Sequence, residues 1–315
     1  MLNYILRRLL LVPLLLIGIT LVVFILIQLA PGDPVTAQYG LKLAEADPVR
    51  IERLREELGL NDPIMVQYVR YLGNLLKGDF GISLTTRTPV LTEIAARFPA
   101  TLELTLAAML IVIVFSIPLG IAAALKRGSL LDNGLMAFSL FGVSMPAFWL
   151  GIMLILLFSL TLGWLPTSGR GTGPLLDRLE YLVLPAVTLG FAILGLNSRI
   201  MRSSMIEVLN QDYIRTAHGK GQKRSVVIIR HALRNALVPI LTLLGVQFAS
   251  LLGGAVIIEM IFAWPGLGRL AVNATMRRDY PVIMGTVLLF SFFYLISSLV
   301  VDIVYTLVDP RIRYE

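Results

Sequence analysis

The segment DYIRTAHGKGQKRSVVIIRHALRNALVP, residues 212–239, decides the fold of this chain, because it is basic, is broken by glycine and lies between two long apolar runs. The runs on either side, at about 182–198 and 236–258, are apolar enough to cross a bilayer, which takes roughly 17 to 25 residues. A basic segment between two such runs predicts a loop held at a membrane surface. A loop of this kind indicates a contact with a partner in the cytoplasm.

The composition extends this interpretation to the whole chain. Of its 315 residues, 57% are hydrophobic and only 15% are charged, whereas about 25% of an ordinary soluble domain is charged. Runs that are long enough to span a membrane recur along the sequence. We therefore predict an all-α membrane protein with six transmembrane helices, at about 9–29, 100–125, 135–162, 182–198, 236–258 and 282–301.

The distribution of Lys and Arg predicts the orientation. Short cytoplasmic loops are enriched in these residues, and the connection after the fourth predicted span carries eight of them. The N-terminus, the connection after the second span and the C-terminus carry further basic residues. Both termini are therefore expected in the cytoplasm. The net charge of +7 comes largely from this loop, and attraction of its basic residues to anionic lipid headgroups accounts for part of it. The charge therefore does not require a nucleic-acid partner.

Between the first two spans lies a long connection that we predict to fold as a helical extracytoplasmic cap. Asp47-Pro48 and Asp62-Pro63 are helix-start signals, and each is followed by apolar residues at helical spacing. Gly59 and Gly78 would end these two helices. A third short helix is expected at about 89–97, and the alternative is a spacer without structure. The predicted organisation is 1–30 (N-terminal end and first span), 31–99 (cap), 100–308 (five-helix core with a cytoplasmic loop at 199–235) and 309–315 (cytoplasmic tail).

Little in the sequence predicts chemistry by this chain itself. It contains no cysteine, and no lysine is followed by serine or threonine, so it carries no phosphate-binding P-loop. His218 and His231 lack a nearby carboxylate cluster that would indicate a metal or a general base. We predict no catalytic residue, no metal site and no cofactor bound by this chain. A self-contained membrane enzyme or channel would need a catalytic cluster or a polar stripe within the spans, and neither is visible.

Polar residues in or beside membrane spans are costly and are candidates for function. The candidates for a translocation pathway are Asn197, Gln247, Ser250 and Glu259. Close helix packing is the alternative for Ser250, which lies four residues before a glycine.

The basic loop itself is predicted to be a helix, a glycine turn and a second helix. Apolar residues at helical spacing up to Tyr213 indicate a helix that leaves the fourth span. Gly219 and Gly221 would break it and allow a sharp turn. A second helix is expected from Ser225 towards Asn235. The alternative is an amphipathic hairpin that lies on lipid.

Ordered blocks along the chain resemble the peptide/nickel subfamily of ABC importer permeases. They include APGDP at 30–34, GDFGIS at 78–83, SMPAFWLG at 144–151, DYIRTAHGKG at 212–221, IFAWPGLG at 261–268 and DPRIR at 309–313. The general coupling motif of these permeases, EAA-x3-G-x9-I-x-L-P, is matched only at Ala217, Gly221 and Leu233. Arg215 stands where that motif has an acidic residue, and Arg234 stands where it has proline.

The resemblance implies a type I ABC importer permease in the inner membrane of a bacterium or archaeon. It implies four further chains, namely a second homologous permease, two cytoplasmic ATPases that bind ATP and Mg, and an external solute-binding protein. The substrate would be a di- or oligopeptide, with nickel, a nickel chelate or glutathione as alternatives. The residues implied in ATPase coupling are Asp212, Tyr213, Arg215, Thr216, Ala217, Gly219, Gly221 and Arg224.

Overall fold

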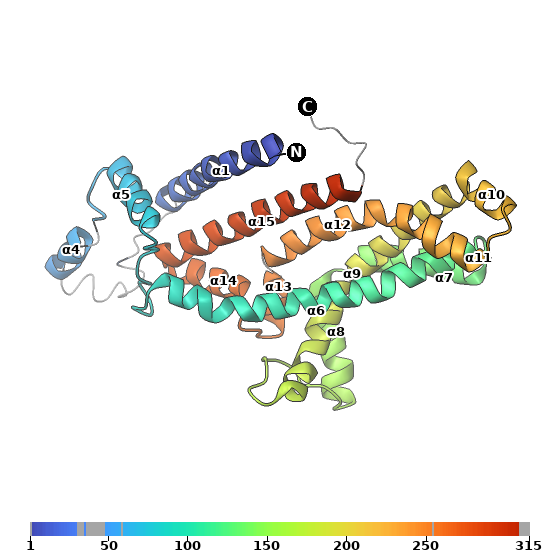
Figure 1. Cartoon of the computed structure of the whole chain (residues 1–315). Helices are drawn as coiled ribbons and strands as arrows, with labels where there is room; N and C mark the ends of the chain where they lie inside the picture. The colour runs from blue at the N-terminus through green and yellow to red at the C-terminus, as the bar shows by residue number, and fades with distance from the viewer. Residues whose placement is uncertain (1, 30–34, 36–47, 58, 254, 309–315) are drawn as a thin grey trace. The chain divides into compact units, whose positions relative to one another are not determined.

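The computed structural model describes residues 2–29, 35, 48–57, 59–253 and 255–308 (Figure 1). Five of its helices are long and apolar enough to cross a membrane, and a bent helix pair makes a sixth span if it is counted as one. This confirms the predicted all-α membrane fold. The straight spans are Leu10–Leu29, Val90–Leu125, Leu176–Leu209, Arg224–Leu252 and Tyr280–Val301.

The third predicted span, 135–162, is a bent helix pair in the structure. The structure has α7 (Leu130–Ser144) and α8 (Ala147–Leu154), the latter continued by the π-helical segment η1 (Ile155–Thr161). The two halves are bent by 103°. The bend lies at Met145 and Pro146. Met145 is extended with φ −84° and ψ 127°, because proline disfavours a helical conformation at the residue before it.

Several helices are longer than the apolar runs that predicted them. α6 runs from Val90 to Leu125, so the short helix expected at 89–97 is the first part of this helix. α9 (Leu175–Leu209) continues well past the predicted span end at 198. In contrast, α12 (Arg234–Leu252) stops before residue 258, and a separate helix α13 (Val256–Ile261) follows. The cap boundary predicted at 99/100 falls inside α6, and the division of the chain into 31–99 and 100–308 stays a prediction.

One of two compact units consists of Leu2–Ala100 and Pro265–Phe293. It contains α1 (Leu2–Leu29), α4 (Pro48–Glu57), α5 (Ile64–Leu76) and α14 (Leu267–Arg277), with the first parts of α6 and α15 (Tyr280–Val308). The two helices predicted after Pro48 and Pro63 are thus confirmed. Gly59 and Gly78, which follow them, have φ of +67° and +79°, a conformation that suits glycine.

The start of α5 differs from the prediction. Pro63 rather than Asp62 is the residue that precedes the helix, and its carbonyl accepts the amide of Val66 at 2.8 Å. The Asp62 carboxylate instead pairs with Arg70, 2.5 Å away. The other Asp-Pro pair of this connection, at 33–34, and the C-terminal tail at 309–315 lie outside the described residues, as do residues 47 and 254.

The other unit consists of Thr101–Trp264 and the chain from Tyr294 onward. Its core joins α6, α9 and α12 through buried side chains that include Val112, Leu194 and Met201. α6 and α9 approach closely at Gly120, because a Cβ there would lie 2.7 Å from the carbonyl oxygen of Ser198. Gly120 and Ala124 are small residues four positions apart, a pattern that permits close helix packing.

Candidate functional site: a helical turn at the end of the long helices

The first limb of the basic loop is a short, separate helix, α10 (Asp212–Gly219). α9 ends at Leu209, and Gln211 is extended with ψ 149°, so the chain changes direction before α10 begins. Asp212 places a carboxylate in the first turn, where the helix dipole favours it. The Thr216 hydroxyl donates to the carbonyl of Asp212 at 3.0 Å. The predicted helix up to Tyr213 is therefore two helices, the end of α9 and the start of α10.

One face of α10 is anchored in the core. Ile214 and Ala217 are buried and belong to the same hydrophobic cluster as Met205 of α9 and Val227 and Ala232 of the second limb. The opposite face is open to solvent, since the side chains of Arg215 and Asp212 are 75% and 97% exposed. The ion pair between these two residues, at 3.6 Å, is exposed and contributes little to stability. α10 is thus held rigidly while it presents a charged surface.

The turn after α10 depends on one glycine. Gly221 has φ +74°, a left-handed conformation that costs an L-residue with a side chain roughly 1–2 kcal/mol, and its amide donates to the carbonyl of His218 at 2.9 Å. Gly219 is instead the last residue of α10. The helix therefore ends at the predicted glycines, and the left-handed residue of the turn is Gly221.

The second limb is continuous with the next membrane span. α11 (Arg224–Val226) is followed without a break by the π-helical segment η2 (Val227–Leu233) and by α12. The second helix was predicted to run from Ser225 towards Asn235, but it begins at Arg224 and reaches Leu252. Any displacement of this limb is therefore delivered directly to a transmembrane helix.

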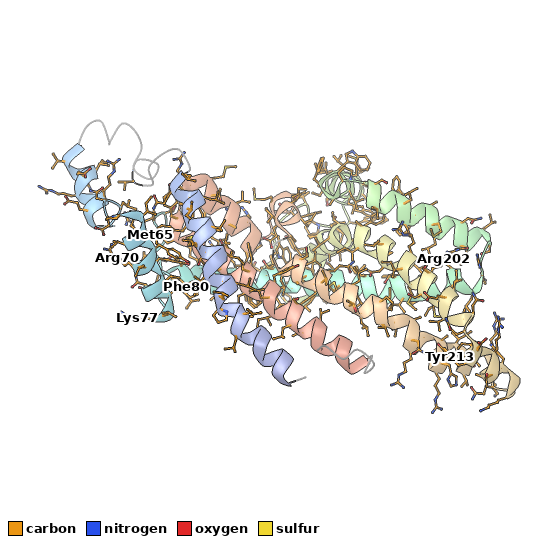
Figure 2. The ribbon with its side chains drawn as sticks, turned by 90° about the horizontal axis from the view of Figure 1, so that it is seen from above. Met65, Arg70, Lys77, Phe80, Arg202 and Tyr213 are labelled. Carbon is orange, nitrogen blue, oxygen red and sulfur yellow. The ribbon has the colours of Figure 1, made fainter. Side chains whose placement is uncertain are left out.

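Two side-chain hydrogen bonds tie the limbs together. The Asn235 amide donates to the Tyr213 hydroxyl at 2.9 Å. His231 and Gln222 are joined at 2.8 Å between ring Nε2 and Oε1. Figure 1 shows α10 and α11 together at one end of α9 and α12, and Tyr213 is labelled there in Figure 2. The loop formed by residues 212–224 is therefore held as one compact turn between two long helices.

The structure brings together two of the four candidate pathway residues. Asn197 on α9 is fully buried, and its amide donates to the Gln247 side-chain oxygen at 2.8 Å and to the carbonyl of Ile193 at 2.9 Å. The Asn197 side-chain oxygen has no hydrogen-bond partner among the described residues. Ser250 is exposed on the last turn of α12. A buried polar atom without a hydrogen-bond partner is costly inside a membrane span. The Asn197–Gln247 pair therefore stays a candidate for function.

Glu259 has a different environment. It lies on α13, is fully buried, and accepts a hydrogen bond from the Thr101 hydroxyl at 2.7 Å. A carboxylate that holds α6 against α13 is typical of a structural contact. A place for Glu259 in the pathway stays a prediction.

Sequence reasoning missed a buried ion pair near the loop. Asp132, in the first turn of α7, accepts two hydrogen bonds from the guanidinium of Arg202 on α9, one of them at 2.8 Å. The same carboxylate accepts the Gly128 amide at 2.9 Å, and Ser129 caps the helix. The Ser129-x-x-Asp132 pattern before an apolar run was the available signal for this helix start. Arg202 is one of the eight basic residues after the fourth predicted span, on which the predicted orientation depends.

Among the described residues, no group of three or more His, Asp or Glu side chains could hold a metal ion. At the loop the structure shows a charged helix, α10, that is anchored in the core on one face and connected at both ends to membrane-spanning helices.

Comparison with solved structures identifies the class of fold. The chain shares its fold with a chain of the MetNI methionine ABC transporter in an inward-facing conformation, with a TM-score of 0.56 and 17% sequence identity. The match covers 69% of this chain and 97% of that one. At this level of identity the likeness concerns the fold alone, which is that of an ABC importer permease.

Sequence comparison gives the family. Residues 116–314 match the family described as binding-protein-dependent transport system inner membrane component. Residues 1–105 match the family described as the N-terminal part of a binding-protein-dependent transport system membrane component. The chain belongs to this family. It is a multi-pass inner-membrane permease subunit of a binding-protein-dependent ABC importer.

Curated relatives are similar along their full length. The chain is 46% identical to the di/tripeptide transport system permease protein DppB of Pseudomonas aeruginosa, with all of both chains covered. It is also 46% identical to the glutathione transport system permease protein GsiC of Salmonella paratyphi A and 44% identical to GsiC of Escherichia coli K12, again over full lengths.

Proposed function

We propose that this chain forms half of the translocation pathway of an ATP-driven importer for di- or oligopeptides, and that the loop 212–224 is its contact with a cytoplasmic ATPase. The second half would be a homologous permease subunit, so that the transmembrane part is a heterodimer. Two ATPase subunits would bind the ATP and Mg, and an external binding protein would deliver the substrate to the cap that contains α4 and α5.

The observation that carries this proposal is the two-sided build of α10. Ile214 and Ala217 fix one face in the core, while Arg215 projects from the other. Because α10 joins α9 through a two-residue bend and α12 through the Gly221 turn, a force on α10 would reach two membrane helices at once. Such an element can bias two packings of the spans that differ by a few kcal/mol. Both termini and the basic loop would lie in the cytoplasm, because short cytoplasmic loops are enriched in Lys and Arg.

Glutathione is the second candidate substrate, and the specific observation in its favour is the equal identity to a glutathione permease. Glutathione is itself a modified tripeptide, so the same pathway chemistry would serve either substrate. Nickel, or a nickel chelate, stays an alternative from the sequence. The substrate specificity among these candidates would be set by the binding protein.

The function is tested by reconstituting the chain in liposomes, alone and with its partner permease, ATPases and binding protein. We expect ATP-dependent uptake of a labelled dipeptide only in the complete set, because the chain has no P-loop of its own. Uptake by the chain alone would contradict the proposal. Competition by unlabelled di- and tripeptides, but not by glutathione or a nickel chelate, would decide the substrate; the reverse order would select glutathione or nickel.

The Asn197–Gln247 pair is proposed to face the pathway in one state of the transport cycle. The unused oxygen of Asn197 could then accept a hydrogen bond from a peptide amide. Asn197→Leu should raise the KM for dipeptide uptake by about tenfold, as expected for the loss of a 1.4 kcal/mol contact. Thr242→Val removes a hydroxyl that donates to the carbonyl of Val238 in the same helix at 3.2 Å, and it should leave the KM unchanged. A KM that is equal in the Asn197→Leu variant and the wild type would remove the pair from the pathway.

A further inference from the structure

Two neighbouring cavities lie in the unit formed by Leu2–Ala100 and Pro265–Phe293, and both are lined by α1, α5 and α15. The first has a volume of about 480 Å³ and its walls are apolar except for Thr20, whose hydroxyl already bonds the carbonyl of Ile17 at 3.0 Å. The second has a volume of about 420 Å³ and mixed walls, which include Arg70 and Asp79. Phe80 belongs to both cavities.

The two cavities are ordered by depth, and both spanning helices show the same order. On α1 the apolar cavity is lined by residues 13–20, and the mixed cavity by residues 24–28, beside the helix end at Leu29. On α15 the mixed cavity is lined by residues 280–284, at the helix start, and the apolar cavity by residues 288–292. The mixed cavity thus lies at the membrane surface and the apolar one below it. Headgroup and acyl chain of a phospholipid have this same order.

α5 serves both cavities because it is amphipathic and fixed in place. Its Leu72, Leu75 and Leu76 line the apolar cavity, whereas Arg70, Tyr71 and Asn74 line the mixed one. The buried hydroxyl of Tyr68 anchors the helix to α1 by donating to the carbonyl of Ile17 at 2.8 Å. Met65 is exposed; Figure 2 labels it with Arg70 and Lys77 along α5, and labels Phe80 just beyond the helix.

The mixed cavity contains a donor without a partner and one charge of each sign. The Tyr71 hydroxyl is buried and has no hydrogen-bond partner among the described residues. Burial, with a smaller contribution from Tyr68, raises the pKa of Tyr71 to about 12, so the hydroxyl stays a neutral donor. The Arg70 guanidinium bonds Asp62 through one nitrogen and has further N–H groups to donate. One oxygen of the Asp79 carboxylate accepts the Gly81 amide at 2.8 Å.

We propose that these two cavities together hold one zwitterionic phospholipid, with a phosphate and an ammonium in its headgroup, from the leaflet on the α5 side of the membrane. An acyl chain fills the apolar cavity. The phosphate accepts hydrogen bonds from Arg70 and Tyr71, and the ammonium lies against Asp79. The lipid thereby completes the contact of α5 with α1 and α15.

Acyl-chain binding is tested with the complete transporter in nanodiscs that contain phosphatidylethanolamine with a photoreactive acyl chain. Illumination should label peptides from residues 13–20 and 288–292. Leu72→Trp, which places a bulkier side chain in the wall of the apolar cavity and narrows it, should lower this labelling about tenfold. The matched control is Met65→Trp, which introduces the same side chain at an exposed position of the same helix, and it should leave the labelling unchanged. Equal labelling of the Leu72→Trp variant and the wild type, or no labelling because the partner permease fills the groove, would overturn the proposal.

Headgroup recognition is tested by mass spectrometry of the lipid retained after purification from vesicles with equal amounts of phosphatidylethanolamine and phosphatidylglycerol. The wild type should retain phosphatidylethanolamine in preference. Arg70→Gln and Tyr71→Phe should each reduce retention of both lipids, whereas Lys77→Gln, which removes an exposed cation that lines neither cavity, should not. Asp79→Asn should abolish only the preference. Equal retention of the two lipids by the wild type would refute the zwitterionic assignment.

Discussion

Asp132→Ala should destabilise the assembled transporter by about 3 kcal/mol, the lower end of the cost of removing one partner from a buried ion pair. Asp132 is almost fully buried, while the side chain of Arg202 is 20% exposed, and this partial solvation places the expected loss at the lower end. The variant leaves the Arg202 guanidinium without its carboxylate and the Gly128 amide without its acceptor. The first loss removes a contact between α7 and α9, and the second weakens the start of α7 itself.

Asp177→Ala is the matched control for this change. Asp177 also lies in the first turn of a helix and accepts a backbone amide, that of Gly173 at 2.9 Å, but this contact is exposed and contains no buried ion pair. Its loss should cost about 1 kcal/mol. The measurement is the temperature at which the detergent-solubilised complex dissociates. Equal shifts for Asp132→Ala and Asp177→Ala would show that the ion pair has no special role.

Gly221→Val should reduce dipeptide uptake about tenfold or more, while the amount of the protein in the membrane stays unchanged. Valine is β-branched and is a genuine outlier at φ +74°, so the turn between α10 and α11 would shift to another conformation. No atom lies within 4 Å of a Cβ built on Gly221, so the effect would come from the backbone and from the ATPase contact, not from a clash within the chain.

Two further variants isolate the backbone effect. Gly219→Val places the same side chain two residues earlier, at a helical position that also has open space around it, and should keep most of the uptake. Gly221→Asn should be intermediate, because asparagine tolerates the left-handed region better than other residues. The ratio of ATP hydrolysed to dipeptide imported is the quantity to follow. If Gly219→Val and Gly221→Val lower uptake equally, the left-handed turn is not what matters.

The positions of the spans could be predicted from the sequence because burial in lipid demands long apolar runs. The helix ends could not, since a helix does not have to stop where the hydrocarbon stops. α9 continues past Arg199 to Leu209, and α6 begins at Val90, ahead of its apolar run. The bend at Pro146 had a local signal, but its 103° depends on the packing of α7 and α8.

In the candidate site, too, some features could be predicted from the sequence and others could not. The turn at Gly221 was predictable, because glycine between two periodic segments indicates a left-handed residue. The Asn197–Gln247 pair and the ion pair between Asp132 and Arg202 join residues far apart in sequence. Periodicity describes one helix at a time and gives no information on which faces of two helices meet. The anchoring of α10 by Ile214 and Ala217 was missed for this reason.

The most direct measurement is a site-specific cross-link from α10. The chain contains no cysteine, so Arg215→Cys creates a single attachment point on the exposed face of α10, and Lys77→Cys creates a control at the end of α5. A short thiol-reactive photo-cross-linker is attached to each variant in the complete transporter. We expect an adduct with the ATPase from Arg215→Cys and none from Lys77→Cys. If residue 215 reacts only with lipid or solvent, and no adduct with the ATPase forms, the loop is not the coupling element.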